Sequence, residues 1–155
     1  FKIEPLASSL DLKAGQVIDR VGLMLGINFP AGPELEKLAL KSNRKFKVHP
    51  CLKGSDCCLS GLENICADMI KSGEPKCDVA RFCLEYIKVT LDKMAQSVLD
   101  KIGRLPLLFA GGVMSNTIIK EFMTEKYGAY FAKPGFSSDN AAGIAALTKI
   151  KTEGL

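Results

Sequence analysis

Apolar side chains recur every three or four positions between residues 11 and 25, which predicts an amphipathic helix. Gly26 follows directly and is a natural C-terminal stop. A second helix is predicted from Pro33, because proline is well placed in a first helical turn. The carboxylates of Glu34 and Glu36 suit the positive end of that helix. The first quarter of the chain is therefore expected to hold two short helices.

The middle of the chain changes pattern twice. Residues 46–59 are short and β-like, with a proline and a glycine interrupting them. Ser60 and Glu63 then have the spacing of a capping box, which predicts the start of another helix. A glycine and a proline separate this helix from a longer one with helical periodicity. Residues 60–102 are therefore expected to form a helical insertion.

The last third alternates between strand and helix patterns. The apolar run at 105–110 predicts a buried strand, and residues 115–127 predict a helix after a diglycine turn. A short apolar run at 129–132 and a helix at 139–150 follow. This order predicts a parallel strand pair joined by a right-handed crossover. Ligands in such sheets sit beyond the C-terminal ends of the strands.

Composition places the chain among globular domains. Its 155 residues are enough for one domain that buries about 70% of its unfolded surface. Hydrophobic residues make up 47% and charged residues 25%, as in ordinary soluble proteins. The net charge is +4, and the densest basic run lies between Lys41 and Lys47. That run is compatible with a polyanionic partner such as RNA, although a solvated face explains it more simply.

The sequence also bears on the cellular location of the protein and on the state of its cysteines. No apolar stretch reaches the roughly 18 residues of a membrane span, and no leader pattern is present, so we expect a cytoplasmic protein. Because the chain opens with Phe1 inside an apparent strand, it is expected to be part of something longer. Its six cysteines form no CxxC pair, which favours reduced, mostly buried thiols over a zinc or redox centre.

Two positions could carry ligand chemistry. Gly111 and Gly112 follow an apolar strand and precede a helix, so the backbone can approach a ligand and the helix N-terminus can offer N–H groups to an anion. A tight turn capped by Ser115 or Asn116 is the alternative reading. Asp139 either caps the final helix or contributes to a site for a hard cation, which requires further ligands from elsewhere.

No self-contained catalytic centre is visible. His49 is the only histidine, which excludes a multi-histidine metal site and an HExxH protease site within this chain. No serine lies in a GxSxG elbow, and no cysteine–histidine pairing is indicated. We therefore assign no catalytic residue from the sequence.

Four ordered segments together resemble the C-terminal half of the TsaD family. They read DLKAGQVIDRVGLMLGINFPAGPELEKLA, CCLSGLENI, LLFAGGVMSN and SSDNAAGIAAL. This family comprises the tRNA threonylcarbamoyladenosine transferases, whose members also carry the older names O-sialoglycoprotein endopeptidase and glycoprotease. The resemblance implies half of an actin-like (ASKHA) ATPase fold, with a mixed sheet containing parallel strands. Residues 1–155 would then be the C-terminal subdomain of a longer protein.

The resemblance also implies roles for single residues. Asp19 corresponds to the aspartate of the family's EAFDK motif, and Gly32 to the second glycine of its GGP turn; both would help to hold the nucleotide sugar, with Glu36. Asn116 resembles the asparagine that closes the GGV-containing motif, so that Gly111 and Gly112 would form a nucleotide wall with it. Asp139 matches the aspartate of the TDNAA motif, which is a metal ligand in the family.

Departures from the family pattern point to a divergent paralogue. GEAFDK reads GQVIDR at 15–20, GGP reads AGP at 31–33, FSFSGLK reads CCLSGLE at 57–63, and CTDNAAM reads SSDNAAG at 137–143. The HxxxH pair that supplies the family's other metal ligands has no counterpart here. The chain is therefore expected to be inactive by itself.

The leading hypothesis from the resemblance is a nucleotide-binding domain of a threonylcarbamoyltransferase. Its ligand would be ATP or threonylcarbamoyl-adenylate, with a divalent metal (iron, zinc or magnesium) that needs ligands from the N-terminal half. Its partners would be that N-terminal half, tRNA, other threonylcarbamoyl-transfer proteins and a second copy in a homodimer, without a membrane. The alternatives are a non-catalytic binding or regulatory module in a tRNA-modifying complex and a metal-dependent glycoprotein endopeptidase.

Overall fold

The computed structural model describes residues 3–136 and 141–153, and its helices and strands follow the predicted order. The first two thirds contain α1 (Ala14–Met24), α2 (Gly32–Ala39), β1 (Cys51–Lys53), β2 (Asp56–Cys58), α3 (Ser60–Lys71) and α4 (Lys76–Ile102). The last third contains β3 (Leu108–Phe109), the 3-10 helix η1 (Gly112–Ser115), α5 (Thr117–Tyr127), β4 (Tyr130–Phe131), the 3-10 helix η2 (Pro134–Phe136) and α6 (Ala141–Glu153). Among these described segments, no helix is long and apolar enough to cross a membrane.

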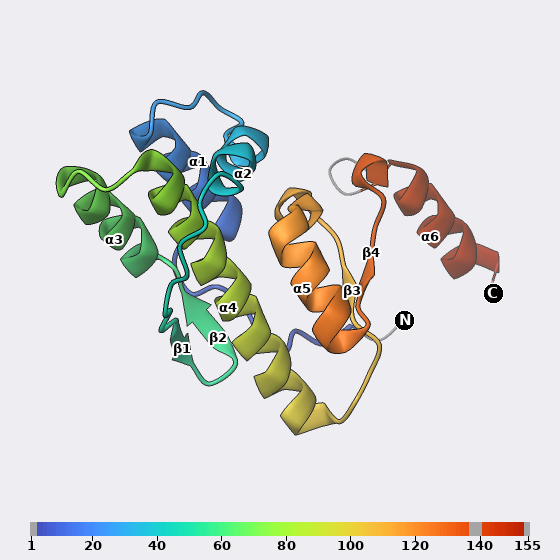
Figure 1. The fold of residues 1–155 in the computed structure, drawn as a ribbon. Helices are drawn as coiled ribbons and strands as arrows, with labels where there is room; N and C mark the ends of the chain where they lie inside the picture. Colours follow the sequence, from blue (N-terminus) through green and yellow to red (C-terminus); the bar gives the residue numbers. More distant parts are fainter. Residues whose placement is uncertain (1–2, 137–140, 154–155) are drawn as a thin grey trace.

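The long helix α4 runs through the centre of the molecule (Figure 1). It packs against α1, α2, α3 and α5, and against both strands of the β1–β2 hairpin. Each fully buried aliphatic side chain contributes about 1.5 to 3 kcal/mol to folding. The largest side chains that are fully buried in this core are Val17, Val21, Leu35, Leu62, Val79, Leu84, Ile87, Ile119 and Met123.

The segment before α1 has a different role from the one predicted. The helix begins at Ala14, three residues later than predicted. Asp11 lies outside it and instead caps the start of α3. The carboxylate of Asp11 accepts hydrogen bonds from the backbone N–H groups of Leu59 (2.7 Å) and Ser60 (3.1 Å) and from the Ser60 hydroxyl (2.7 Å). The predicted capping box of Ser60 and Glu63 is therefore wrong, because Leu59 is the N-cap of α3 and Ser60 already lies in its first turn.

Hydrogen bonding changes the acidity of Asp11. Burial acts to raise the pKa of this carboxyl, but the hydrogen bonds from Leu59, Ser60 and Leu12 outweigh it and hold the pKa well below its usual range. Asp11 therefore stays ionised and joins the start of α1 to the start of α3. Two segments that are far apart in the sequence are fixed to each other by one carboxylate.

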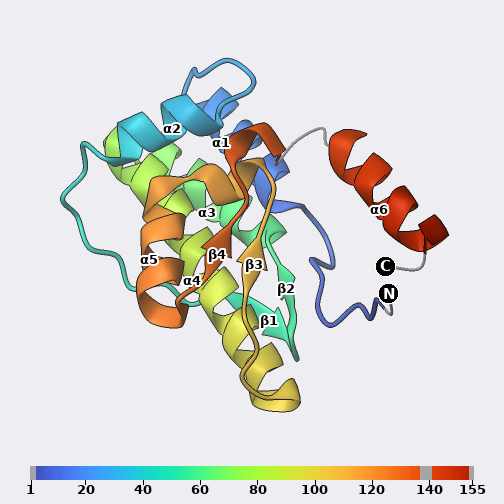
Figure 2. The same cartoon turned by 90° about the vertical axis from the view of Figure 1, so that its right-hand side faces the viewer.

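The last third confirms the predicted parallel pair. β3 pairs with β4 in parallel, with Leu108 opposite Tyr130 and Phe109 opposite Phe131. The two phenylalanine rings stack at 5.3 Å between centroids on the face that the core covers. The expectation of a buried strand is wrong for the other face, because Leu108 is 73% exposed and Tyr130 is 66% exposed. Only one face of this two-stranded sheet is covered (Figure 2).

The overall class is mixed α/β, with one parallel and one antiparallel strand pair in the described residues. Helix α6 lies apart from the other elements in both views (Figures 1 and 2), and its Ile144 and Leu147 are exposed. Two strands make too small a sheet to identify an actin-like fold, so this assignment stays a prediction. The same holds for the domain boundaries and for the interpretation of residues 60–102 as an insertion.

Candidate functional site

A pocket of about 270 Å³ lies where the first turn of α2 faces η1. It contains four of the residues predicted as a binding site, which come from segments about 80 positions apart. Hydrophobic side chains of α1 and η1 complete its floor. The lining residues are Ile18, Gly32, Pro33, Glu36, Gly112, Val113, Ser115 and Asn116.

Asp19 supports the pocket from outside its lining. Its Oδ1 atom accepts a hydrogen bond from the backbone N–H of Ala31 at 2.9 Å, just before Gly32. This bond fixes the turn that leads into α2. Close packing fixes it further, because a Cβ atom at Gly22 would lie 2.3 Å from the Cβ of Ala31. Asp19 thus positions the pocket wall through Ala31.

The two glycines of the turn after β3 differ in what they require. Gly111 has φ +109° and ψ 160°, a conformation that is open almost only to glycine. Gly112 has no such backbone constraint, and a Cβ atom there would meet nothing within 4 Å. The fold therefore needs glycine at 111. At 112 the missing side chain leaves room in the pocket.

Asn116 ends η1 and caps α5. Its Oδ1 atom accepts a hydrogen bond from the backbone N–H of Ile119 at 3.2 Å, as expected of an N-cap. This confirms the predicted cap at Asn116. The side-chain Nδ2 atom has no hydrogen-bond partner among the described residues, so it can donate to a ligand in the pocket.

The start of α5 does not offer all the free N–H groups that the sequence indicated. The Glu36 Oε1 atom accepts hydrogen bonds from the Thr117 backbone N–H at 2.7 Å and from the Thr117 hydroxyl. With Ile119 capped by Asn116, two donors of the first turn are already used. A carboxylate of the chain itself therefore occupies this helix end, where an external anion was expected.

Thr117 was not predicted as part of the site. It follows the N-cap in a helix-start pattern, but its partner Glu36 lies 81 positions earlier in the chain. No local spacing signals such a pair. Asp139, the predicted metal ligand, lies outside the described residues.

The cysteines fit the structural interpretation in part. All six are free thiols, of which Cys57, Cys66 and Cys83 are buried, whereas Cys51 is exposed. A hydrogen bond with Cys66, together with burial, raises the pKa of the Cys83 thiol well above its usual value. That thiol stays protonated and unreactive. In the part of the chain that the structure describes, no three His, Cys, Asp or Glu side chains gather into a metal-binding group.

Comparison with known proteins identifies the family of this chain. The sequence model of the TsaD family, described as tRNA N6-adenosine threonylcarbamoyltransferase, matches residues 1–146. The chain belongs to the TsaD family. The resemblance seen in the four sequence segments is thereby confirmed.

A relative in Thermoplasma volcanium shows how much of such a protein the chain represents. It is named a probable bifunctional tRNA threonylcarbamoyladenosine biosynthesis protein, and it is 34% identical over 146 residues. The match covers 90% of this chain but 28% of the relative. The chain is thus similar to one part of a larger TsaD-family protein.

Proposed function

We propose that this chain is the C-terminal nucleotide-binding domain of a TsaD-like tRNA N6-adenosine threonylcarbamoyltransferase. The observation that carries the proposal is the single pocket in which Gly32, Glu36, Gly112 and Asn116 meet. By the resemblance, Gly32 corresponds to the GGP turn of the family and Asn116 to the asparagine that closes its GGV-containing motif, and we propose that Glu36 and Gly112 join them. The proposed ligand is ATP or threonylcarbamoyl-adenylate.

The size of the pocket is consistent with one part of a larger binding site. Its volume of about 270 Å³ is just below the roughly 300–1,000 Å³ of ordinary ligand sites. The open space at Gly112 admits a close ligand, and the Asn116 amide supplies a donor. The rest of the nucleotide would be enclosed by the N-terminal half of the protein. The isolated domain is therefore proposed to bind weakly and to be inactive alone.

The exposed apolar surface supports the same partner. Leu108 and Tyr130 project from the uncovered face of the β3–β4 sheet, and Ile144 and Leu147 are exposed on α6. Exposed apolar groups gathered on one sheet face and one helix are typical of an interface. We assign this surface to contact with the remainder of the longer protein. A homodimer and a cytoplasmic location remain part of the proposal.

The metal site is proposed from the family motif alone. Asp139 would supply one ligand to a divalent ion (iron, zinc or magnesium), which would polarise oxygen atoms of the substrate. The other ligands would come from the N-terminal half. The endopeptidase hypothesis has little support, because a hydrolytic zinc site needs about three protein ligands and Asp139 is the single metal ligand assigned here.

A non-catalytic regulatory module is the second candidate, and the replacement of the GEAFDK glutamate by Gln16 motivates it. In the structure, the Gln16 Oε1 atom accepts a hydrogen bond from the Lys13 backbone N–H at 3.0 Å, within the first turn of α1. Gln16 does not line the pocket. Since the glutamine keeps a capping contact, its presence does not by itself argue against nucleotide binding.

Hydrogen exchange tests the binding part of the proposal. Saturating ATP or threonylcarbamoyl-adenylate should slow amide exchange at 111–116 in the full-length gene product. Exchange at 60–71 in α3, away from the pocket, serves as the internal control. Unchanged exchange at 111–116 in a folded protein would reject the nucleotide site. Rescue of a transferase-deficient strain by the full-length gene would exclude a purely structural role, whereas chelator-sensitive cleavage of a glycoprotein would favour the endopeptidase.

A further inference from the structure

The chain between α2 and the first hairpin has a regular two-sided pattern. From residue 45 to residue 53 the side chains alternate between exposed and half-buried at every position. Lys45, Lys47, His49 and Lys53 all lie on the exposed side. We call these four residues the basic row. Figure 1 shows the segment as an extended trace that leads from α2 into β1, and in Figure 2 it runs along the left-hand edge of the molecule.

The other side of the segment fixes it to the core. The Phe46 ring packs edge-on against Phe82 of α4 at 5.3 Å between centroids, and Val48 packs against the buried cluster. The backbone N–H of Cys51 donates to the Tyr86 hydroxyl at 3.2 Å. The basic row is therefore presented on an anchored, extended backbone.

Among the described residues, no acidic side chain pairs with the lysines of the basic row. Within the described residues, no ion pair engages Lys45, Lys47 or Lys53, although Lys53 lies opposite Asp56 in the hairpin register. The neighbouring Arg44 is different, because it pairs with Glu74 at 2.6 Å. Glu74 is therefore neutralised locally and does not oppose the charge of the row.

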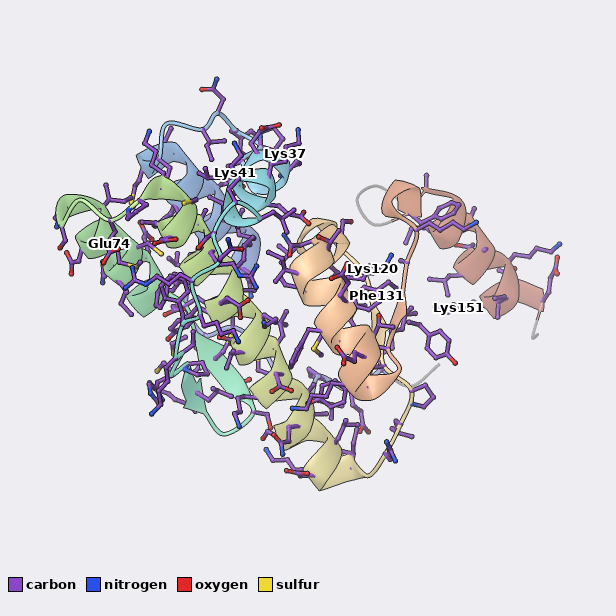
Figure 3. The ribbon with its side chains drawn as sticks, viewed as in Figure 1. Lys37, Lys41, Glu74, Lys120, Phe131 and Lys151 are labelled. Atoms are coloured by element: carbon purple, nitrogen blue, oxygen red, sulfur yellow. The ribbon has the colours of Figure 1, made fainter. Side chains whose placement is uncertain are left out.

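Several other cations of the described residues make contacts within the fold. Lys126 pairs with Asp92 at 2.6 Å, Lys88 pairs with Glu85, and the Lys120 ammonium lies 5.9 Å from the centre of the Phe131 ring (Figure 3). Unpaired lysines on one side of an extended segment form a surface for a polyanion. Alternate residues of an extended chain are about 6.6 Å apart, comparable with the separation of successive phosphates along a nucleic acid strand.

We propose that the basic row binds the phosphate backbone of the RNA substrate. The proposal rests on the function assigned above and adds a docking surface to it. Helix α2 links the pocket to the segment that carries the row, because Gly32 at its start lines the pocket and Lys41, which precedes the row, follows its end (Figure 3). Its 8 residues span about 12 Å, and the row begins six residues beyond its end, at Lys45. Such lysine contacts fix the register of the RNA rather than read its sequence.

Charge reversal of the row in the full-length gene product tests this. Binding of tRNA is measured by fluorescence anisotropy for the wild type and for Lys45→Glu/Lys47→Glu, at two salt concentrations. The matched control is Lys149→Glu/Lys151→Glu on α6, which changes the net charge equally. We expect about tenfold weaker binding for the row variant, with a salt slope smaller by about 1 to 2 units. The control should bind within about twofold of the wild type.

Folding and function are checked separately. Nucleotide protection of 111–116 should be unchanged in the row variant, and Lys45→Ala/Lys47→Ala replaces it if charge reversal prevents folding. Wild-type tRNA affinity in the row variant, or an equal loss of affinity in the control, would show that the basic row does not bind RNA. Neither result would contradict the proposed transferase function. If the row variant loses binding to anionic lipid vesicles but keeps its tRNA binding, the basic row binds a membrane surface and not RNA. A wild-type protein that binds no tRNA overturns the row and the RNA-directed function together.

Discussion

The Glu36 carboxylate accepts a hydrogen bond from the Thr117 backbone N–H at 2.7 Å, and so joins α2 to the start of α5. Glu36 lines the candidate site, and Thr117 directly follows Asn116, which lines its other side. Glu36 was expected to contact a nucleotide sugar, but in the structure its Oε1 atom holds the two walls together. The width of the pocket therefore depends on this contact.

Removing the carboxylate should loosen the pocket. We expect Glu36→Ala to lower the free energy of unfolding by about 1 kcal/mol, since the hydrogen bond involves a charged group at a partly exposed position. Amide exchange at Thr117 should increase. The matched control is Glu34→Ala, because Glu34 pairs only with Lys37 on the same helix. Equal effects of the two substitutions in urea unfolding and amide exchange would show that the Glu36–Thr117 hydrogen bond does not hold the two walls together.

Adding one methyl group at Gly112 should separate binding from folding. A Cβ atom there meets nothing within 4 Å, so Gly112→Ala should leave the urea midpoint nearly unchanged. The methyl group would occupy pocket space, and nucleotide affinity should fall by about tenfold, or about 1.4 kcal/mol. Gly61→Ala in α3 is the control, since its Cβ atom also meets nothing. Calorimetric titration that shows equal affinity for both variants would remove Gly112 from the site.

The close approach of α1 to the turn before α2 should tolerate no side chain. Gly22→Ala places a Cβ atom 2.3 Å from that of Ala31, so we expect a loss of about 1 to 3 kcal/mol from overpacking. Gly15→Ala in the same helix meets only Val113 at 3.7 Å and should be neutral or stabilising. Thermal unfolding of both variants measures the contrast. A stable Gly22→Ala protein would disprove the tight packing.

Acid should weaken the contact between the starts of α1 and α3. The pKa of Asp11 is lower in the folded state than the unfolded value of about 3.9, so its stabilising effect is complete above that value. It decreases as the pH falls below about 4, because the unfolded carboxyl then begins to bind a proton, and it is fully lost only when the folded carboxyl protonates at a lower pH. Asp11→Asn should therefore be less stable than the wild type at pH 7, with a difference that shrinks toward pH 2.

Urea titrations at several pH values measure this difference. Asp68→Asn is the control, because Asp68 is exposed and pairs only with Lys71. A gap between wild type and Asp11→Asn that does not change with pH would show that the carboxylate charge is unimportant.

Local patterns predicted much of this molecule. The apolar spacing before Gly26, the proline at the start of α2 and the diglycine turn all act over a few residues, and the structure has α1, α2 and η1 at those places. The capping of α3 could not be predicted in this way. Ser60 and Glu63 satisfy a local rule, but Asp11 makes the contact from 48 positions away.

The contacts of the candidate site also divide into those that local patterns predict and those that depend on tertiary packing. Asn116 as an N-cap is a local inference, whereas the pairing of Glu36 with Thr117 depends on tertiary packing. The family motifs identified Gly32 and Asn116 as members of one site because such motifs record contacts that are distant in sequence. The exposure of Leu108 was mispredicted since an apolar run indicates burial without saying what covers it.

The two walls of the pocket come from α2 and η1, which are far apart in the sequence. A ligand that touches both walls binds only when α2 and η1 are docked, so it draws the equilibrium toward the docked form. Nucleotide at 100 times its dissociation constant would add about 2.7 kcal/mol to that docking. The substrate would then act as a folding ligand, and the melting temperature of the protein would report its nucleotide concentration.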